Sequence, residues 1–248
     1  MAQIHSAAFT QLARGAAVAV NKALDFVNKQ NALIFECGVG DGTTAANLVR
    51  AGHRVIGVDQ SPDMIDLARK RVPNAEFIEA TCYKFDIPKV EVVLAVGEVL
   101  CYRNSGHNHP DCVYEFFAKV YKALEPGGIF IFDIVTLDRI PNPNPMQTFA
   151  QHGEVAMAVE TTGNIENRSL RRDVTVFEGD GESYHKVNES HELYLFDKDE
   201  VISELKKLGF SCTTTLRYAD FDLFPGLVAI WARKPEQGES QVQTNLVP

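Results

Sequence analysis

Three glycines at alternate positions, with a carboxylate before them, stand between an apolar run and a predicted helix. The carboxylate is Glu36 and the glycines are Gly38, Gly40 and Gly42, after the apolar residues 33–35. Glycine permits backbone torsions that other residues avoid, and it lets a ligand approach the main chain closely. Amides at the start of the following helix point at such a ligand. The pattern therefore predicts a strand, a tight turn and a helix that hold a bound molecule.

A second carboxylate, Asp59, ends the next apolar run, residues 54–58. It follows Gly42 at about the spacing at which nucleotide-binding folds place the acid for ribose hydroxyls. A carboxylate there can accept two hydrogen bonds from a vicinal diol. Ser61 and Pro62 then have the residue types of a helix N-cap and first helical position. The alternative role for Asp59 is that of helix cap, for which Ser61 is already available.

The glycine spacing separates two classes of nucleotide site. A dinucleotide fold needs its third glycine where Thr43 stands. The series E-x-G-x-G-x-G instead resembles the first motif of the class I S-adenosylmethionine-dependent methyltransferases, and it matches at every defined position. The resemblance covers roughly residues 30–233. It implies S-adenosylmethionine as cofactor and S-adenosylhomocysteine as product. On the glycines alone, a loop in another doubly wound fold stays open.

Residues 58–64 resemble the second motif of that family. The resemblance implies that Asp59 holds the ribose, while Gln60 and Met64 flank the adenine. An ordinary core position is the alternative for Met64.

The third and fourth motifs agree less closely. Most of the family has Gly-Asp-Ala after the third strand, with the Asp bonding the adenine amino group, whereas this chain has Ala80, Thr81 and Cys82. A hydroxyl at Thr81 can accept one hydrogen bond, without charge assistance. The fourth strand ends at Val96, where the resemblance implies contact with the methionine part of the cofactor. It also implies that Glu98 lies nearest the transferred methyl group.

The order of predicted elements indicates an α/β fold. Strands and helices alternate over residues 33–134, which favours a parallel sheet with helices on both faces. Residues 211–218 and 226–233 are predicted as final strands. The family resemblance makes these an antiparallel hairpin at the edge of a Rossmann-like, mostly parallel sheet of seven strands. Ligands bind beyond the carboxyl ends of such strands, where each motif lies.

We expect a single methyltransferase domain over residues 1–234. About residues 1–30 form a predicted helical cap over the cofactor, or a helix packed on the sheet edge. Alternation of apolar residues over 153–196 predicts three or four antiparallel strands, with turns at residues 163–164 and 179–181. They belong to an inserted lid at about residues 141–197. The tail, 235–248, is polar and predicted to be disordered.

Composition excludes several classes of function. The formal net charge is −9, which argues against nucleic acid as substrate, since phosphate backbones need clustered Lys and Arg. Arg168, Arg171 and Arg172 stand beside acids and are predicted to form a solvated strand face. The five cysteines include no C-x-x-C pair, which favours reduced thiols in a cytoplasmic protein. His107 and His109 lack an evident third ligand, so no metal site is predicted. No membrane span or secretory signal is evident.

The predicted reaction is methyl transfer to an oxygen or nitrogen nucleophile of a small molecule by in-line displacement. Such nucleophiles shed a proton, often to a carboxylate or histidine. Glu98 is the first candidate for accepting that proton or for binding an acceptor amine, with a structural acid as the alternative. His191 is the second. It shares a strand face with Glu189, although a lid-surface position is the alternative for both, as for His185. A non-catalytic sensing or partner module that binds the cofactor is the other hypothesis, favoured only by Thr81.

Overall fold

The computed structural model describes residues 2–26, 29–103, 110–179 and 183–236. Its main sheet has seven strands in the order β10-β13-β5-β4-β1-β2-β3. The pairs from β5 to β3 are parallel, and β13 runs antiparallel to both its neighbours. The strands of this sheet are β1 (Leu33–Cys37), β2 (Arg54–Asp59), β3 (Glu76–Glu79), β4 (Val90–Ala95), β5 (Leu124–Val135), β10 (Ser211–Thr215) and β13 (Leu227–Arg233). The predicted Rossmann-like α/β fold is confirmed.

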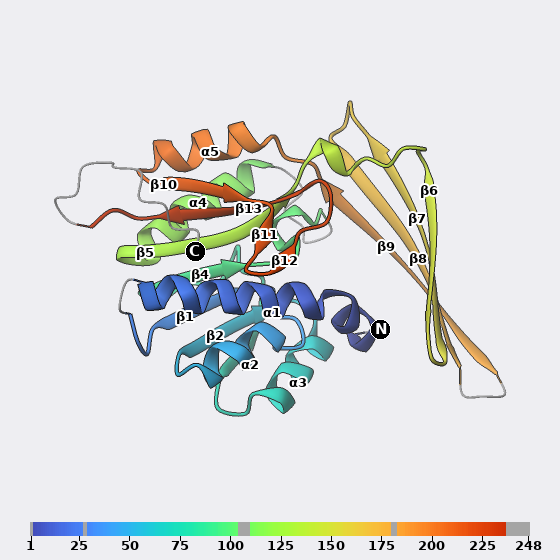
Figure 1. The fold of residues 1–248 in the computed structure, drawn as a ribbon, viewed down its shortest axis with the longest axis horizontal. Helices are drawn as coiled ribbons and strands as arrows, with labels where there is room; N and C mark the ends of the chain where they lie inside the picture. Colours follow the sequence, from blue (N-terminus) through green and yellow to red (C-terminus); the bar gives the residue numbers. More distant parts are fainter. Residues whose placement is uncertain (1, 27–28, 104–109, 180–182, 237–248) are drawn as a thin grey trace.

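Helices cover both faces of the sheet (Figure 1). One face carries α1 (Ala2–Phe26), α2 (Thr43–Arg50) and α3 (Pro62–Arg71), and the other carries α4 (Pro110–Ala123) and α5 (Lys198–Lys207). The predicted cap of α3 is present, since Ser61 Oγ accepts from the Met64 amide at 3.4 Å. The N-terminal segment, for which a helical cap was predicted, forms one long helix. None of the helices in the described ranges is long and apolar enough to cross a membrane.

The central strands are buried on both sides, which agrees with their continuous apolar sequences. Phe130 and Phe132 of β5 share one face, with ring centroids 4.4 Å apart, and Phe117 of α4 packs across both. The register of β1 with β2 pairs Cys37 with Val58. The ends of these two strands are therefore level, which brings the glycine turn beside Asp59.

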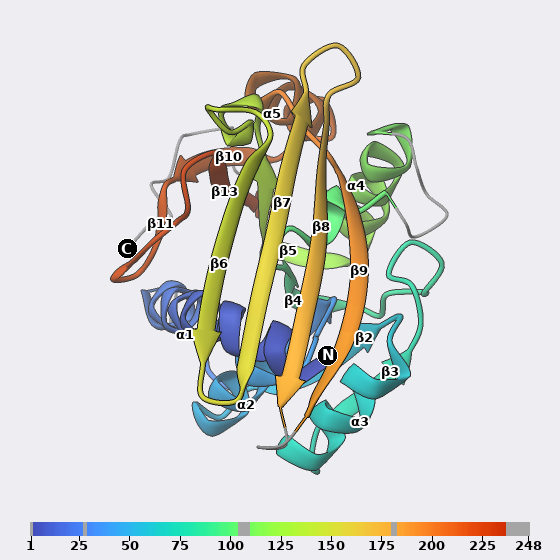
Figure 2. The ribbon, with the colours of Figure 1, turned by 90° about the vertical axis from the view of Figure 1, so that its right-hand side faces the viewer.

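A second sheet stands beyond the carboxyl ends of the parallel strands (Figures 1 and 2). Its four antiparallel strands, in sequence order, are β6 (Met146–His152), β7 (Val155–Asn164), β8 (Ser169–Gly179) and β9 (Tyr184–Tyr194). We call this sheet the lid. The expected antiparallel insert is confirmed, but β6 precedes residue 153, where the alternation was predicted to begin.

Two details of the strands differ from the prediction. Gly163 and Asn164 are the last residues of β7 rather than a turn, and the turn follows at residues 165–168. Asn164 Oδ1 accepts from the Asn167 amide at 2.9 Å, and this hydrogen bond closes the turn that follows β7. The final strand pair is interrupted by a small hairpin of β11 (Arg217–Tyr218) and β12 (Phe221–Asp222).

Candidate active site

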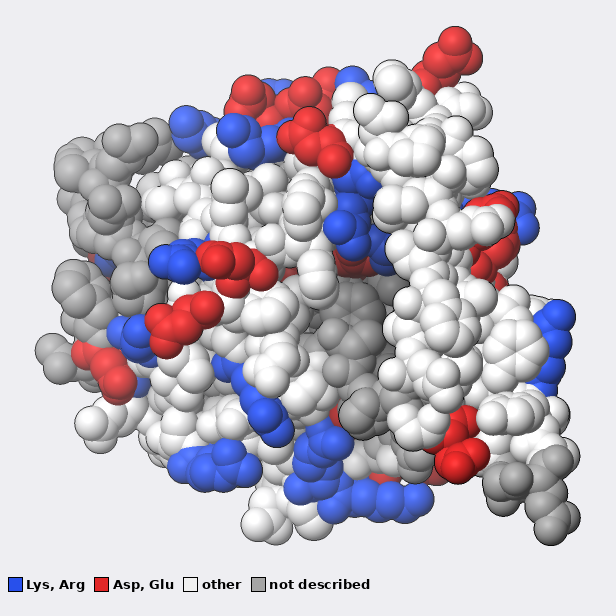
Figure 3. Space-filling view, turned by 45° about the vertical axis from the view of Figure 1, so that its right-hand side comes forward, with Lys and Arg blue, Asp and Glu red and all other residues white. Residues whose placement is uncertain are grey.

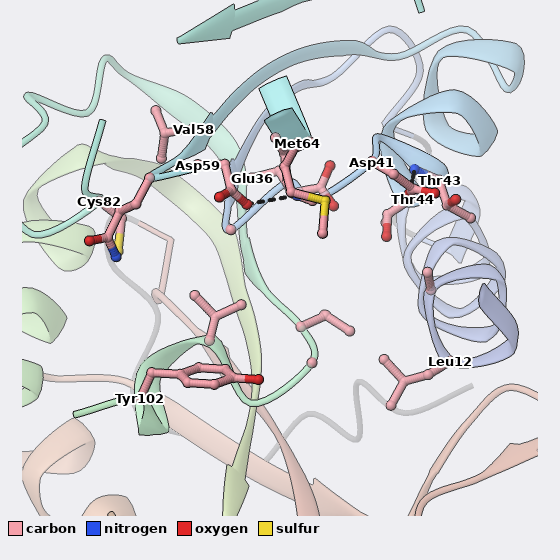
Figure 4. A pocket seen from close by; sticks show the side chains of 18 of the residues that line it. Leu12, Glu36, Asp41, Thr43, Thr44, Val58, Asp59, Met64, Cys82 and Tyr102 are labelled. Atoms are coloured by element: carbon pink, nitrogen blue, oxygen red, sulfur yellow. Dashed lines mark hydrogen bonds between the residues drawn. The ribbon is translucent and has the colours of Figure 1, made fainter. Parts of the chain in front are cut away.

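A cavity of about 260 Å³ lies at the carboxyl ends of β1, β2 and β4, beside α1. Thr10, Leu12 and Ala13 of α1 form part of its wall. Figure 4 shows Asp59, Glu36 and Met64 on the strand side of this space, with Tyr102 and Leu12 opposite. The predicted cofactor residues that line the cavity are Glu36, Gly38, Gly40, Asp59, Gln60, Met64, Cys82 and Val96.

The glycine turn is tied to the second carboxylate. The Gly40 amide donates to Asp59 Oδ2 at 2.9 Å (Figure 4). The Ser61 amide donates to Asp59 Oδ1, also at 2.9 Å. Gly40 has φ +56, and a Cβ there would meet no atom within 4 Å. Burial raises the pKa of Asp59 above its ordinary value, against these amide bonds, which lower it. The first and second motifs therefore form one rigid unit at the cavity wall.

Gly42 is outside the cavity lining and has a packing role. It precedes α2 with φ +78, and a Cβ there would lie 3.0 Å from Ala68 Cα in α3. Dinucleotide folds use their third glycine for this kind of close packing. The prediction that Gly42 touches the cofactor is corrected accordingly.

Thr81 is also absent from the lining, although its neighbours Ala80 and Cys82 contribute to it. The Thr81 carbonyl accepts from the amides of Lys84 and Phe85, so the chain turns at this point. Thr81 Oγ1 is buried and has no partner among the described residues. The predicted adenine contact at Thr81 is therefore not supported, because the turn takes this hydroxyl out of the cavity wall.

Glu36 is a buried carboxyl inside the cavity. Its residue exposure is 4%, and Oε2 has no partner in the described part of the chain. Burial raises its pKa to about 8; the Thr44 side chain lowers it, and the charges of Asp41 and Asp59 add to the rise. A carboxyl held in this way is complementary to a cationic group of a ligand.

Glu98 was predicted to lie nearest the transferred methyl group, but its side chain does not line the cavity. Val96, Gly97 and Val99 line the wall, whereas the Glu98 side chain is 1% exposed and bound elsewhere. Its two carboxylate oxygens accept from Arg172 Nη1 and Nη2 of the lid at 2.6 and 3.0 Å. Both oxygens are thus engaged by the guanidinium, and the side chain is absent from the cavity lining. The geometry therefore disfavours Glu98 as proton acceptor.

The same contact corrects the prediction for the basic cluster. Arg168 bonds Glu200 and Arg171 bonds Asp173 on exposed surface, as expected of a solvated face. Arg172 instead points inward, with 15% of its side chain exposed. Successive residues of a strand face opposite sides, so only one of the two neighbouring arginines on β8 reaches the core.

Asp133 is a site residue that sequence reasoning missed. Its carboxylate accepts from the amides of Gly97 at 2.8 Å and Glu98 at 2.5 Å, and from the Tyr218 hydroxyl at 3.2 Å. Burial raises the pKa of Asp133 to about 6. A lone carboxylate inside the apolar run of β5 was the available signal, because buried charges in strands require partners.

His191 lies on the lid, outside the cavity lining and against Tyr102. Its Nε2 is 3.1 Å from Glu189 Oε2, and its ring packs edge-on against Tyr102 with centroids 5.9 Å apart. Tyr102 itself lines the cavity. His185 lies further along β9 and is exposed. His107 and His109 fall outside the described residues.

Known proteins match this chain along its central part. Residues 34–128 match the family model described as a methyltransferase domain. A methyltransferase candidate of Bacillus subtilis, YqeM, is 27% identical over 184 residues, which are 71% of this chain and 72% of that protein. The chain is a class I S-adenosylmethionine-dependent methyltransferase.

Solved structures agree with the fold of this methyltransferase. An S-adenosylmethionine-dependent methyltransferase from Clostridium acetobutylicum superposes with a TM-score of 0.77 at 16% identity, covering 90% of this chain and 92% of that one. CalS10, an amino pentose methyltransferase from Micromonospora echinaspora, superposes with a TM-score of 0.74 at 17% identity, covering 93% and 96%.

The cavity of the methyltransferase fits its cofactor. S-adenosylmethionine carries an ammonium and a sulfonium, and Glu36 offers a buried carboxyl oxygen that has no partner within the described ranges. Asp59 stands at the end of the adjacent strand, where a carboxylate can accept from a ribose diol. Over the described ranges, no group of three His, Cys, Asp or Glu side chains could hold a metal ion.

Proposed function

We propose that this methyltransferase transfers a methyl group to an oxygen or nitrogen nucleophile of a small molecule by in-line displacement. The bound cofactor supplies a methyl group already activated on a sulfonium. The protein must then hold the acceptor in line with that methyl and exclude water. Different parts of the chain would hold the two reactants: the cavity for the cofactor and the lid for the acceptor.

On the cofactor side, Asp59 would accept hydrogen bonds from the ribose hydroxyls, beside the Gly40 amide that already fixes its carboxylate. Gln60 and Met64, which line the cavity next to it, would flank the adenine. Glu36 would bind the ammonium of the methionine part, because an opposite charge stabilises a buried carboxylate. Gly38 lets the main chain approach the ligand.

The observation that carries the acceptor assignment is the contact between the cavity wall and the lid. Tyr102 lines the cavity, pairs with Leu193 of β9 and packs on His191. An acceptor that reaches the methyl group from this side would lie between Tyr102 and the lid. In Figure 3, the side of the lid that is turned toward the viewer carries mainly uncharged side chains.

The register of the lid indicates what the acceptor would meet there. Arg172 lies opposite His191 and Val174 lies opposite Glu189, so all four share the face that reaches the core. Besides Arg172, this face carries aliphatic side chains such as Val174 and the polar His191–Glu189 pair. We assign proton acceptance to His191, oriented by Glu189, in preference to Glu98.

Two further observations support a small acceptor. The net charge of −9 is unfavourable for a polyanionic substrate. The structurally similar CalS10 is an amino pentose methyltransferase, which makes sugar amines a natural first group of acceptors to test.

The test is transfer of a labelled methyl group from S-adenosylmethionine to a panel of small hydroxyl, phenol and amine compounds, with RNA and protein as parallel substrates. Label in at least one small-molecule product, reduced about a hundredfold in His191→Gln, is the expected result. His185→Gln is the matched control on the same strand. Label in RNA or protein alone, or binding of cofactor with transfer to nothing, would contradict the proposal.

A further inference from the structure

The turn that follows β4 is restrained by a buried carboxylate from β5. Asp133 accepts from the amides of Gly97 and Glu98 at 2.8 and 2.5 Å, and Tyr218 donates to it at 3.2 Å. Glu98 has φ +64, a left-handed conformation that is unfavourable for a residue with a side chain. Because Gly97 and Val99 line the cavity, these restraints fix part of the cofactor wall.

A second restraint on the same turn comes from the lid. Arg172 of β8 donates two hydrogen bonds to the Glu98 carboxylate, at 2.6 and 3.0 Å, across 74 positions of sequence. The two side chains are 15% and 1% exposed. Separating them would leave an uncompensated charge in the interior, which is strongly unfavourable. The lid therefore cannot shift at this point without moving the turn.

The segment after the turn continues along the lid. Tyr102 forms a β-bridge with Leu193, and the Arg103 amide donates to the Glu192 carbonyl at 2.8 Å. Arg103 Nη1 also reaches Glu192 Oε1 at 3.1 Å. The wall of the cofactor cavity and strand β9 thus form one continuous unit.

We propose that Arg172 and Asp133 are positioning residues for methyl transfer, acting through Glu98. Asp133 sets the backbone of the turn at the cofactor, and Arg172 sets the lid on the side chain of the same residue. An acceptor bound to the lid is thereby held in line with the methyl group in the cavity. The same connection makes occupancy of the cavity stabilise the lid. This inference rests on the proposed function, which places the acceptor under the lid.

The first test needs no acceptor. Amide hydrogen exchange of β8 and β9 is measured with and without S-adenosylhomocysteine, in wild type, Arg172→Gln and the outward-facing control Arg171→Gln. In wild type and the control, S-adenosylhomocysteine should slow amide hydrogen exchange of β8 and β9 about tenfold, which is within the usual range of coupling between two sites. In Arg172→Gln this slowing should disappear, while the Kd measured by calorimetry stays within about threefold.

The second test separates positioning from stability. Glu98→Gln/Arg172→Gln removes both charges, so no unpaired charge is buried, and the double variant should regain most of the melting temperature that Arg172→Gln loses. With an acceptor from the label-transfer panel, kcat should stay about a hundredfold low in both variants. KM for S-adenosylmethionine should remain within about threefold of wild type. A purely structural role would restore kcat together with the melting temperature.

The outcomes distinguish the two proposals. Unchanged slowing of exchange in Arg172→Gln, or wild-type kcat in the double variant, would overturn the positioning role and leave the proposed function standing. Failure of wild type to bind S-adenosylhomocysteine would overturn both. Transfer only to a macromolecule, with the lid still coupled through Arg172, would reject the small-molecule acceptor and retain the coupling.

Discussion

The cofactor cavity and the junction beneath the lid bind their residues together in opposite ways. The cavity joins residues that are close in sequence, chiefly within 36–64, and its main contacts are backbone amides on Asp59. The junction joins Glu98 to residues far apart in sequence: its side chain pairs with the Arg172 guanidinium, and its amide donates to the buried Asp133 carboxylate. Contacts between neighbours in sequence leave a local motif, whereas contacts between buried charges and distant segments do not.

The largest effect is expected at the junction. Asp133→Asn replaces an acceptor of two amides with a group that carries one acceptor oxygen and one donor amide. The turn at Gly97 should shift, and turnover of a methyl acceptor should fall about a hundredfold, whereas Kd for S-adenosylhomocysteine should rise by less than about tenfold. Steady-state kinetics and calorimetry on the same preparation check both values. An equal loss of cofactor affinity would erase the division between the regions.

This division explains what the sequence could predict. Glycine spacing and Asp59 located the cofactor wall, because tight turns admit few residue types. The regular alternation of apolar residues located the sheet and most of the lid. The sequence could not predict that Arg172 points inward, since a slip of one residue in strand register would place it on the opposite face. The role of Glu98 was misjudged for the same reason: its partner belongs to the lid.

In the cavity, Glu36→Gln should weaken S-adenosylmethionine binding at pH 8 by about tenfold. The carboxyl of the free protein has a pKa raised by burial to about 8, so at pH 7 it must lose its proton to pair with the ammonium. Binding should therefore release a proton, and affinity should rise with pH up to about 8. Calorimetry in buffers of different ionisation enthalpy counts that proton. The same proton count in Glu36→Gln would show that another group releases it.

The junction predicts a different pH dependence. Burial raises the pKa of Asp133 to about 6, while Glu98 and Tyr218 face it. Protonation below that value removes an acceptor of the turn amides, so kcat should fall by up to about tenfold per pH unit.

Stability should respond in the opposite direction. With a folded-state pKa above the ordinary 3.8, the folded state holds more protons than the unfolded state between these values. Acidification through this window therefore adds to the contribution of Asp133 to stability. Denaturant titrations at pH 5 and 7, with Asp133→Asn as control, check the sign. If Asp133→Asn still shows the fall of kcat at acidic pH, that fall belongs to another group.

The smallest effect separates two glycines of one motif. Gly42→Ala brings a Cβ to 3.0 Å from Ala68 Cα at a positive φ, and should lower the free energy of unfolding by about 1–3 kcal/mol. Its Kd for S-adenosylhomocysteine should stay near wild type, because Gly42 is outside the cavity lining. Gly40→Ala, at a position with open space around its Cβ, should affect the Kd more than Gly42→Ala does. A larger change of Kd in Gly42→Ala than in Gly40→Ala would mean that Gly42 serves binding and Gly40 serves packing.

The role of Asp59 in holding the cofactor is tested most directly by calorimetric titration of wild type, Asp59→Ala and Asp63→Ala with S-adenosylhomocysteine. Asp59 joins the glycine turn to the second strand, whereas Asp63 is exposed in the first turn of α3. We expect wild type and Asp63→Ala to bind, and Asp59→Ala to lose at least about a hundredfold in affinity, since charge-assisted hydrogen bonds are the strong ones. Equal affinity in all three proteins, or no binding by any of them, would contradict this role of Asp59.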